Sequence, residues 1–198
     1  GNAFTPHSED AARECDVLFI CIPVRSMGKL VSEMAPYLTP GTIVTDVGSV
    51  KSTVIQDVEP HIPDDCFFVP GHPVAGLEAS GPEKGFATLF ENRSYVFTPC
   101  SRTTPESLEK VRTLIEKTGA KTLDLDAEEH DRILGFTSHM PHIIAFAAML
   151  ESHKMSDELG LDISIFNGGS YEDMTRVSTA DLAMWRDIFL TNSENIRF

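Results

Sequence analysis

The stretch Asp16-Val17-Leu18-Phe19-Ile20-Cys21-Ile22 contains a continuous apolar run of strand length, and Pro23 closes it. An apolar run without polar alternation is typical of a strand buried on both faces, as in a parallel sheet covered by helices. Helical patterns flank the run, a short one over residues 8–14 and a longer one from Ser26, its predicted N-cap, to about Leu38. This arrangement predicts an α/β domain.

The alternation of strands and helices continues downstream. The clearest helix covers residues 105–118, with Thr104 as its cap and Gly119 as its stop. Another helix is predicted from Ser49 or Val50 through Val58. Further strands are predicted at Thr42–Asp46, Cys66–Pro70, Ser94–Thr98 and Lys121–Leu125. Strands that alternate with helices imply right-handed crossovers and a doubly wound, Rossmann-type parallel sheet.

The pattern changes after about Asp126. Residues 127–198 contain no convincing strand, and the helical stretches are predicted at 127–136, 138–153, 171–177 and 181–196. We therefore expect two domains, an α/β domain over residues 1–126 and a helical domain over residues 127–198. The fold class is α/β followed by all-α.

Composition limits the function classes. Acidic residues outnumber basic ones 30 to 16, and the net charge of -14 argues against partners such as nucleic acid and anionic membrane surfaces. No apolar run approaches the roughly 20 residues of a membrane span, and the N-terminus has no signal-peptide pattern. The four cysteines form no Cys-x-x-Cys pair, which favours reduced thiols. We expect a soluble cytoplasmic protein.

Two polar side chains are predicted at one rim of the sheet. His72, in Gly71-His72-Pro73-Val74-Ala75-Gly76, follows a strand and is expected on a tight loop, where catalytic residues concentrate. Ser49, in Asp46-Val47-Gly48-Ser49-Val50-Lys51, lies where a strand ends and a helix begins, which is where ligands bind in open α/β sheets. The alternatives are that His72 is an ordinary turn histidine and Ser49 only an N-cap.

Three histidines in the helical part raise the question of a metal. At about 100° per residue, His139 and His142 share a helix face, whereas His130 lies about 180° from His139. One straight helix cannot gather all three, and no cysteine or carboxylate pair completes a ligand set, so we predict no metal. We expect His142 to point into a cleft. His130 and His139 have the alternative of pairing with a carboxylate or a carbonyl.

Arg176 follows the glycine pair Gly168-Gly169 and could bind a carboxylate with its two-pronged guanidinium. Its alternative is a salt bridge with Asp173 or Glu172. Trp185 is by default a core residue.

Five of these segments, taken in order, resemble the prephenate and arogenate dehydrogenases of tyrosine biosynthesis. They are Asp46–Lys51, Gly71–Gly76, His130 with Ser138–His142, Asp173–Arg176 and Met184–Phe189. The resemblance implies a nicotinamide-dinucleotide domain followed by a helical dimerisation domain, a homodimer, and an active site between the domains. It also implies NAD(P)-dependent oxidative decarboxylation of prephenate to 4-hydroxyphenylpyruvate, or of arogenate to tyrosine.

The resemblance also implies roles for individual residues. His72 would take the proton of the substrate's ring hydroxyl, and Ser49 would be its partner beside the nicotinamide. Arg176 would bind the substrate carboxylate. The other implied substrate contacts are His142, Trp185, Glu78 and Asp173, and the implied cofactor contacts are Pro23, Val24, Gly48 and Ser49.

The sequence departs from the family in one large respect. The 198 residues contain no Gly-x-Gly-x-x-Gly, and the family's first strand, phosphate-binding turn, first helix and second strand have no counterpart. The last helices of the family's dimerisation domain are also expected to be cut short. Two alternatives therefore stay open: a non-catalytic or partner-dependent module that binds substrate, and a 3-hydroxy acid dehydrogenase of the same fold.

Overall fold

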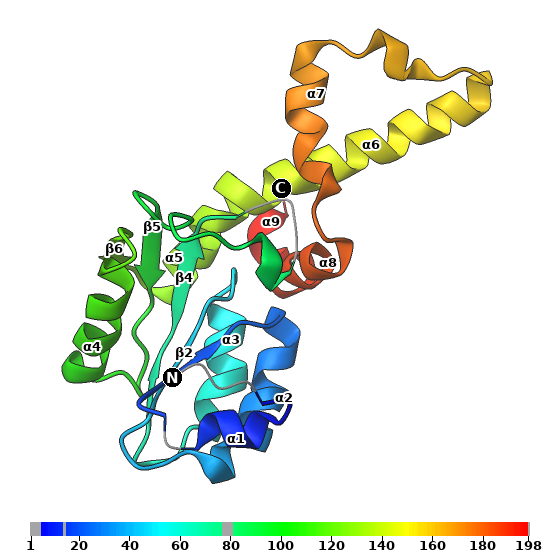
Figure 1. Cartoon of the computed structure of the whole chain (residues 1–198). Helices are drawn as coiled ribbons and strands as arrows, with labels where there is room; N and C mark the ends of the chain where they lie inside the picture. The colour runs from blue at the N-terminus through cyan, green and yellow to red at the C-terminus, as the bar shows by residue number, and fades with distance from the viewer. Residues whose placement is uncertain (1–4, 14, 77–80, 198) are drawn as a thin grey trace.

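Two three-stranded sheets form the first part of the chain in a computed structural model that describes residues 5–13, 15–76 and 81–197 (Figure 1). The first sheet has the order β1-β2-β3 and is parallel, with strands Val17–Ile20, Ile43–Asp46 and Phe67–Val69. The second has the order β4-β5-β6, with strands Gly71–Val74, Ser94–Phe97 and Lys121–Asp124. Only Pro70 separates β3 from β4, so the chain passes directly from one sheet into the other.

Helices cover both faces of the first sheet. On one face, α2 (Val24–Met34) and α3 (Ser52–Val58) pack on Val44 and Phe68. On the other face, α4 (Pro105–Glu116) packs with Ile43 and Val69. The short elements are α1 (Ser8–Ala12) and the 3-10 turns η1 (Ala35–Tyr37), η2 (Glu59–His61) and η3 (Pro82–Lys84). The predicted α/β architecture is confirmed.

Helix α4 also confirms its predicted cap. The Thr104 hydroxyl accepts a hydrogen bond from the backbone N–H of Ser107, whose own hydroxyl accepts from the Thr104 N–H. The predicted cap of α2 is wrong, since that helix begins earlier, with Pro23 at the N-cap position. The N–H of Ser26 instead bonds the carbonyl of Pro23 at 2.9 Å.

Two further expectations about strands are corrected. Strand β1 pairs only with β2 among the described residues, and Phe19 is 39% exposed, so β1 is an edge strand and not one buried on both faces. Strand β4 runs antiparallel to β5, whereas β5 and β6 are parallel. No helix crosses over between β3 and β4, so β4 continues past the first sheet and β5 returns beside it.

The second part is helical and begins with one long helix. Helix α5 (Ala127–Leu134) passes through a π-helical turn, η4 (Gly135–His139), directly into α6 (Met140–Leu159). The helix start predicted near Ser138 corresponds to this π turn, after which α6 begins at Met140 with Pro141 in its first turn. The remaining elements are η5 (Ile163–Phe166), α7 (Gly169–Thr175), η6 (Arg176–Thr179), α8 (Leu182–Thr191) and α9 (Ser193–Ile196).

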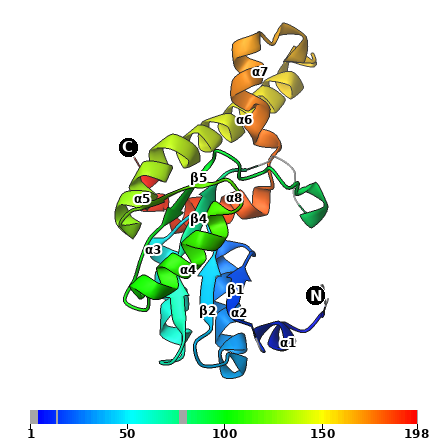
Figure 2. The ribbon, with the colours of Figure 1, turned by 60° about the vertical axis from the view of Figure 1, so that its left-hand side comes forward.

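The far end of α6 and the whole of α7 extend away from the sheets, as both views show (Figures 1 and 2). The near end of α6 and helix α8 lie against the first part of the chain. There Val50 packs into a cluster with Ala180, Trp185 and Ile188. This cluster joins the helical part to the loop before α3.

Within the described residues, the continuous helix Ala127–Leu159 is long and apolar enough to cross a membrane by length and composition alone. Such a helix is weak evidence for a span. Four histidines interrupt its sequence, and two of them, His130 and His139, are buried against other parts of the chain. We interpret its exposed apolar side chains below as a protein contact surface.

Candidate active site

His72 lies within strand β4 and not on a loop, which corrects the prediction from the sequence. Its strand forms one edge of the second sheet. Pro73, which has no backbone N–H, is tolerated there because an edge strand has a neighbouring strand on one side only. Gly71 precedes it because a Cβ at that position would lie 2.6 Å from Cε1 of the buried Tyr95. The imidazole is buried, and its Nδ1 lies 2.8 Å from Nε2 of His130 in α5. The base candidate therefore contacts the helical part of the chain directly.

Asp131, next to His130, binds the start of helix α3. Its Oδ1 accepts from the backbone N–H of Lys51 at 2.7 Å, and its Oδ2 accepts from that of Ser52 at 2.8 Å. Oδ1 also lies 2.8 Å from Nδ1 of His130. Helix α3 begins at Ser52, so the alternative that Ser49 caps it is wrong. The carboxylate of Asp131 therefore occupies the N-terminus of α3.

A buried ion pair lies behind His72. The ammonium group of Lys51 donates to Oδ2 of Asp46 and, at 2.7 Å, to the carbonyl of Gly71. Asp46 also accepts from the backbone N–H groups of Gly48, at 2.7 Å, and Gly71, at 3.3 Å. Both charged side chains are inaccessible to solvent. This pair fixes the end of β2 against the residue that precedes His72.

Burial and these neighbours set the protonation states. Burial holds the pKa of His72 well below its ordinary value of 6.5, and the nearby His130, Lys51 and His139 act in the same direction. The pKa of Asp131 is lowered, because the hydrogen bonds from His130, Lys51 and Ser52 outweigh the burial that opposes them. His72 is therefore neutral and Asp131 ionised near neutral pH. A neutral imidazole can accept a proton.

The predicted cofactor residues surround one pocket. Pro23 and Val24, after β1, and Gly48 and Ser49, after β2, line a pocket of about 450 Å³ together with Met184 and other residues. The full lining is Cys21, Ile22, Pro23, Val24, Val47, Gly48, Ser49, Gly81, Asp181, Met184 and Ile188. The pocket lies at the carboxyl ends of parallel strands, where open α/β sheets bind ligands. Its volume and mainly apolar lining suit the nicotinamide end of a dinucleotide.

Ser49 lines this pocket, whereas His72 is not among its lining residues. In the described part of the chain no hydrogen bond joins them. They are connected through Lys51, whose N–H binds the carboxylate that contacts His130. The structure connects the two predicted residues by this chain of contacts and not by a direct one.

Two further histidines of the long helix, His139 and His142, pack around Trp185. The His142 ring stacks on the indole, with centroids 3.5 Å apart and planes 19° from parallel, and its Nδ1 lies 2.9 Å from the carbonyl of Ser138. His139 is buried, and its Nδ1 accepts from Nδ2 of Asn192 at 2.9 Å. Burial first, together with His130 and His142, lowers the pKa of His139 to about 4, against the opposing charge of Asp131.

The π turn changes the predicted directions of these histidines. Along a straight α-helix His130 and His139 would face about 180° apart, and one extra residue in a π turn removes roughly 100° of that angle. Both side chains consequently reach the same neighbourhood, where Nδ2 of Asn192 also donates to the carbonyl of Asp131 at 2.8 Å. Gly135 permits this packing, since a Cβ there would lie 2.9 Å from the Asn195 carbonyl. The described residues hold no group of three potential metal ligands.

The predicted carboxylate-binding residues lie farther along the chain. Arg176 begins η6 and Asp173 lies one turn earlier in α7, and both are exposed. Trp185 is buried, as expected of a core residue. Glu78 lies outside the described residues.

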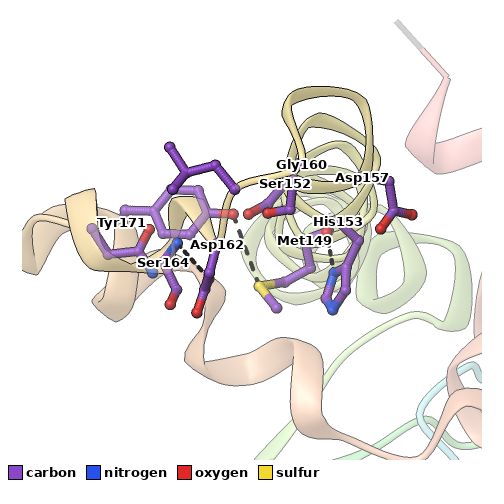
Figure 3. Close-up of a pocket in the computed structure, with 11 residues that line it drawn as sticks. Met149, Ser152, His153, Asp157, Gly160, Asp162, Ser164 and Tyr171 are labelled. Carbon is purple, nitrogen blue, oxygen red and sulfur yellow. Dashed lines mark hydrogen bonds between the residues drawn. The ribbon is translucent and has the colours of Figure 1, made fainter.

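A second pocket, of about 560 Å³, opens at the far end of α6, facing η5 and α7 (Figure 3). Met149, His153, Asp162 and Tyr171 are among its lining residues, and the Tyr171 hydroxyl donates to the carbonyl of Ala148 at 3.1 Å. None of the predicted site residues lines it. This second pocket therefore lies outside the predicted site.

Comparison with known proteins agrees with both halves of this description. Residues 2–124 match the family described as prephenate dehydrogenase, nucleotide-binding domain, and residues 126–197 match prephenate dehydrogenase, dimerization domain. The chain belongs to the prephenate dehydrogenase family. The resemblance drawn from five short segments is thereby confirmed.

Individual members of the family are similar along nearly the whole chain. A cyclohexadienyl dehydrogenase from Zymomonas mobilis is 36% identical over 98% of this chain and 66% of its own length. A prephenate dehydrogenase from Bacillus subtilis is 34% identical over 93% of this chain and 50% of its own. The crystal structure of an Aquifex aeolicus prephenate dehydrogenase with hydroxyphenyl propionate and NAD+ superposes with a TM-score of 0.87 at 34% identity, covering 97% of this chain and 66% of that one. The chain spans half to two thirds of these relatives.

The sequence did not reveal three residues of this site. Asp131, Lys51 and Asn192 are polar side chains whose partners are distant in the sequence, up to 80 residues away for Asp131. The adjacent His130-Asp131 pair was a usable signal, because a carboxylate beside a histidine is a common way to orient an imidazole.

Proposed function

We propose that the protein containing this chain is an NAD(P)-dependent prephenate or arogenate dehydrogenase that works in tyrosine biosynthesis. The observation that carries the proposal is a neutral, buried His72 held by the helical part of a chain whose two segments both match this family. The domain division proposed near residue 126 places His72 before the boundary and His130 after it.

In this proposal the pocket beside Ser49 holds the nicotinamide end of the dinucleotide, with Pro23, Val24 and Gly48 as further contacts. The bound dinucleotide supplies the hydride acceptor. Ser49 orients the nicotinamide relative to the substrate. The pocket contacts proposed here do not distinguish NAD from NADP.

His72 acts as the general base. The hydroxyl on the carbon that loses the hydride becomes more acidic as the reaction proceeds, and its proton moves to the imidazole. The substrate's ring carboxylate leaves as carbon dioxide, which makes the ring aromatic and drives the reaction without a metal. The protein's main contribution is to hold the reactants in register.

Arg176 binds a substrate carboxylate in this proposal, with Asp173 and Glu78 in the polar network around it. The His142–Trp185 stack forms a rigid wall of the substrate site. A positively charged arginine is needed there because the chain as a whole carries a charge of -14 and would repel an anionic substrate.

The helical part dimerises with a second copy of the chain in this proposal. Its family match is to a dimerisation domain, and large apolar side chains such as Ile165 and Phe166 are exposed on it. A partner of the same kind would cover these side chains and the exposed apolar face of α6. We accordingly propose a cytoplasmic homodimer that binds neither nucleic acid nor membrane.

The test is turnover by the full-length natural protein with prephenate or arogenate and either dinucleotide, followed by the absorbance of the reduced nicotinamide. We expect activity with at least one combination of substrate and dinucleotide. Arg176→Ala should raise KM by about 10-fold or more with a smaller change in kcat, because it removes a charge-assisted bond present before the reaction. Absence of turnover with all four pairs would contradict the proposal. Calorimetry that shows substrate binding without dinucleotide binding would support the substrate-binding alternative instead.

A further inference from the structure

Three hydrogen-bonding groups in a row connect the start of helix α3 to the imidazole of His72. The Asp131 carboxylate contacts Nδ1 of His130 at 2.8 Å, and Nε2 of His130 contacts Nδ1 of His72 at 2.8 Å. All three side chains are buried. Water therefore offers them few alternative partners, and each proton in the row must be placed on one atom or the other.

The carboxylate decides where the protons lie. An ionised carboxylate can only accept, so Nδ1 of His130 carries a hydrogen. A neutral imidazole has one N–H, which leaves Nε2 of His130 as an acceptor. Nδ1 of His72 must then donate to it, and a neutral His72 has an unprotonated Nε2. In the described residues that Nε2 has no hydrogen-bond partner.

We propose that Asp131 and His130 are positioning residues that fix His72 in the tautomer whose Nε2 is free to accept a proton. The tautomer itself follows from the hydrogen bonds alone. Its use in catalysis rests on the proposed function, in which the proton leaves the hydroxyl oxygen of the substrate and forms the N–H bond at Nε2.

The same carboxylate also ties the row to the way the two parts of the chain pack. Oδ1 and Oδ2 of Asp131 accept from Lys51 and Ser52 at the start of α3, and Asn192 of the helical part donates to the Asp131 carbonyl. Asp131 is thus held by both parts at once. The base acquires its acceptor nitrogen only when the helical part sits correctly on the sheet.

Long-range proton–nitrogen NMR of the full-length protein, labelled at histidine nitrogens and free of ligands, reads the tautomers directly. We expect a protonated Nδ1 and a bare Nε2 at His72, and a protonated Nδ1 at His130. The His72 signals are assigned by their loss in His72→Gln. A His72 that carries its proton on Nε2 in the unsubstituted protein would overturn the proposal.

Asp131→Asn should disrupt the row. The NH2 group of the amide must replace either the oxygen that accepts from Lys51 and His130 or the oxygen that accepts from Ser52, so the contact that fixes Nδ1 of His130 is lost or weakened and Nε2 of His72 is no longer held bare. We expect kcat to fall by about 100-fold or more with KM changed only a few-fold, which is the range that general base catalysis contributes. Equal activity, or an unchanged tautomer at His72, would contradict the proposal.

His130→Phe separates positioning from the capping of α3, because Asp131 keeps its bonds to Lys51 and Ser52. We expect a similar fall in kcat, a mixed tautomer at His72 and a native far-ultraviolet circular dichroism spectrum. Asp126→Asn is the matched control: its carboxylate caps α5, the helix that carries His130 and Asp131, by accepting from the backbone N–H of Glu128 at 2.8 Å, and the described residues show no hydrogen bond between it and either histidine ring. That variant should leave kcat and both tautomers unchanged, and a loss equal to that of Asp131→Asn would assign the effect to the helix.

The two proposals can fail separately. An inactive full-length protein with a bare Nε2 at His72 would remove the proposed function and leave the tautomer assignment standing. An active protein with a protonated Nε2 would remove the assignment alone.

Discussion

The junction formed by Asp46, Lys51, His72, His130 and Asp131 contrasts with the arm, which we define as residues 150–175. Every junction side chain is buried and has a partner within the same chain. In the arm only Thr175 is buried, and Phe166 is 72% exposed. The junction side chains therefore find all the partners described above within one chain. The arm instead exposes an apolar surface, which we propose a second copy covers.

The largest expected effect breaks the junction at its ion pair. Lys51→Met leaves the Asp46 carboxylate buried without a counter-ion, so we expect the free energy of unfolding to fall by about 3–5 kcal/mol. Urea unfolding measures this. The matched control is Lys29→Met, since Lys29 is exposed and its pair with Glu33 spans 3.8 Å. In that variant the free energy of unfolding should fall by less than about 0.5 kcal/mol. Equal losses in the two variants would show that the effect of Lys51→Met does not come from the burial of its ion pair.

A second expected effect is the dependence of stability on pH at the buried histidines. Unfolded His139 binds a proton near pH 6.5, whereas the folded protein resists protonation down to about 4, because burial and the neighbouring His130 and His142 outweigh the opposing charge of Asp131. Stability is therefore full above pH 6.5 and falls between pH 6.5 and 4, by about 3 kcal/mol for this residue. The lowered pKa of His72 adds loss in the same direction.

Unfolding measured across this pH range checks the assignment. His139→Gln should flatten the fall by about 3 kcal/mol. His153→Gln, at an exposed position on the same helix, should leave it unchanged. An unaltered slope in the first variant would place the titrating group elsewhere.

A smaller effect is expected from crowding the backbone beside His72. Gly71→Ala places a Cβ 2.6 Å from a ring carbon of Tyr95, which is itself buried and cannot swing away. We expect a loss of about 1–3 kcal/mol, as for other overpacked cores. Gly76→Ala, where nothing lies within 4 Å of the added carbon, is the control. Matching stabilities in the two variants would contradict the close approach at Gly71.

How far the sequence predicts this molecule depends on where the partners of each residue lie. The strands and α4 could be predicted because their signals are local, such as the apolar run at Val17–Ile20 and the Thr104 cap. The antiparallel pairing of β4 could not, since it depends on the return of a strand about 20 residues later. The same holds for Asp131, whose bonds to α3 span 80 residues.

The candidate site divides in the same way. The predicted cofactor residues follow predicted strands, and they line one pocket in the structure. The direction of His130 was wrong because the π turn at Gly135–His139 has no clear sequence signal apart from Pro141. His72 was singled out from the sequence, but its predicted position on a loop was wrong. The glycines and prolines around it suggested a loop, whereas the structure has an edge strand there.

The smallest effect on stability is expected in the arm. Phe166→Ser should change the free energy of unfolding of the separated chain by less than about 0.5 kcal/mol, because the ring is exposed. If a second copy covers it, the same change should raise the dissociation constant of the dimer about 10-fold or more. Sedimentation over a dilution series measures this, with the exposed Glu158→Gln as control. An unchanged dissociation constant would exclude Phe166 from the contact.

The most direct test of the central claim is the steady-state kinetics of His72→Asn in the full-length protein with its best substrate pair. If His72 is the base, kcat falls by about 100-fold or more while KM changes only a few-fold. A loss that appears mainly in KM, or no loss at all, would contradict the account.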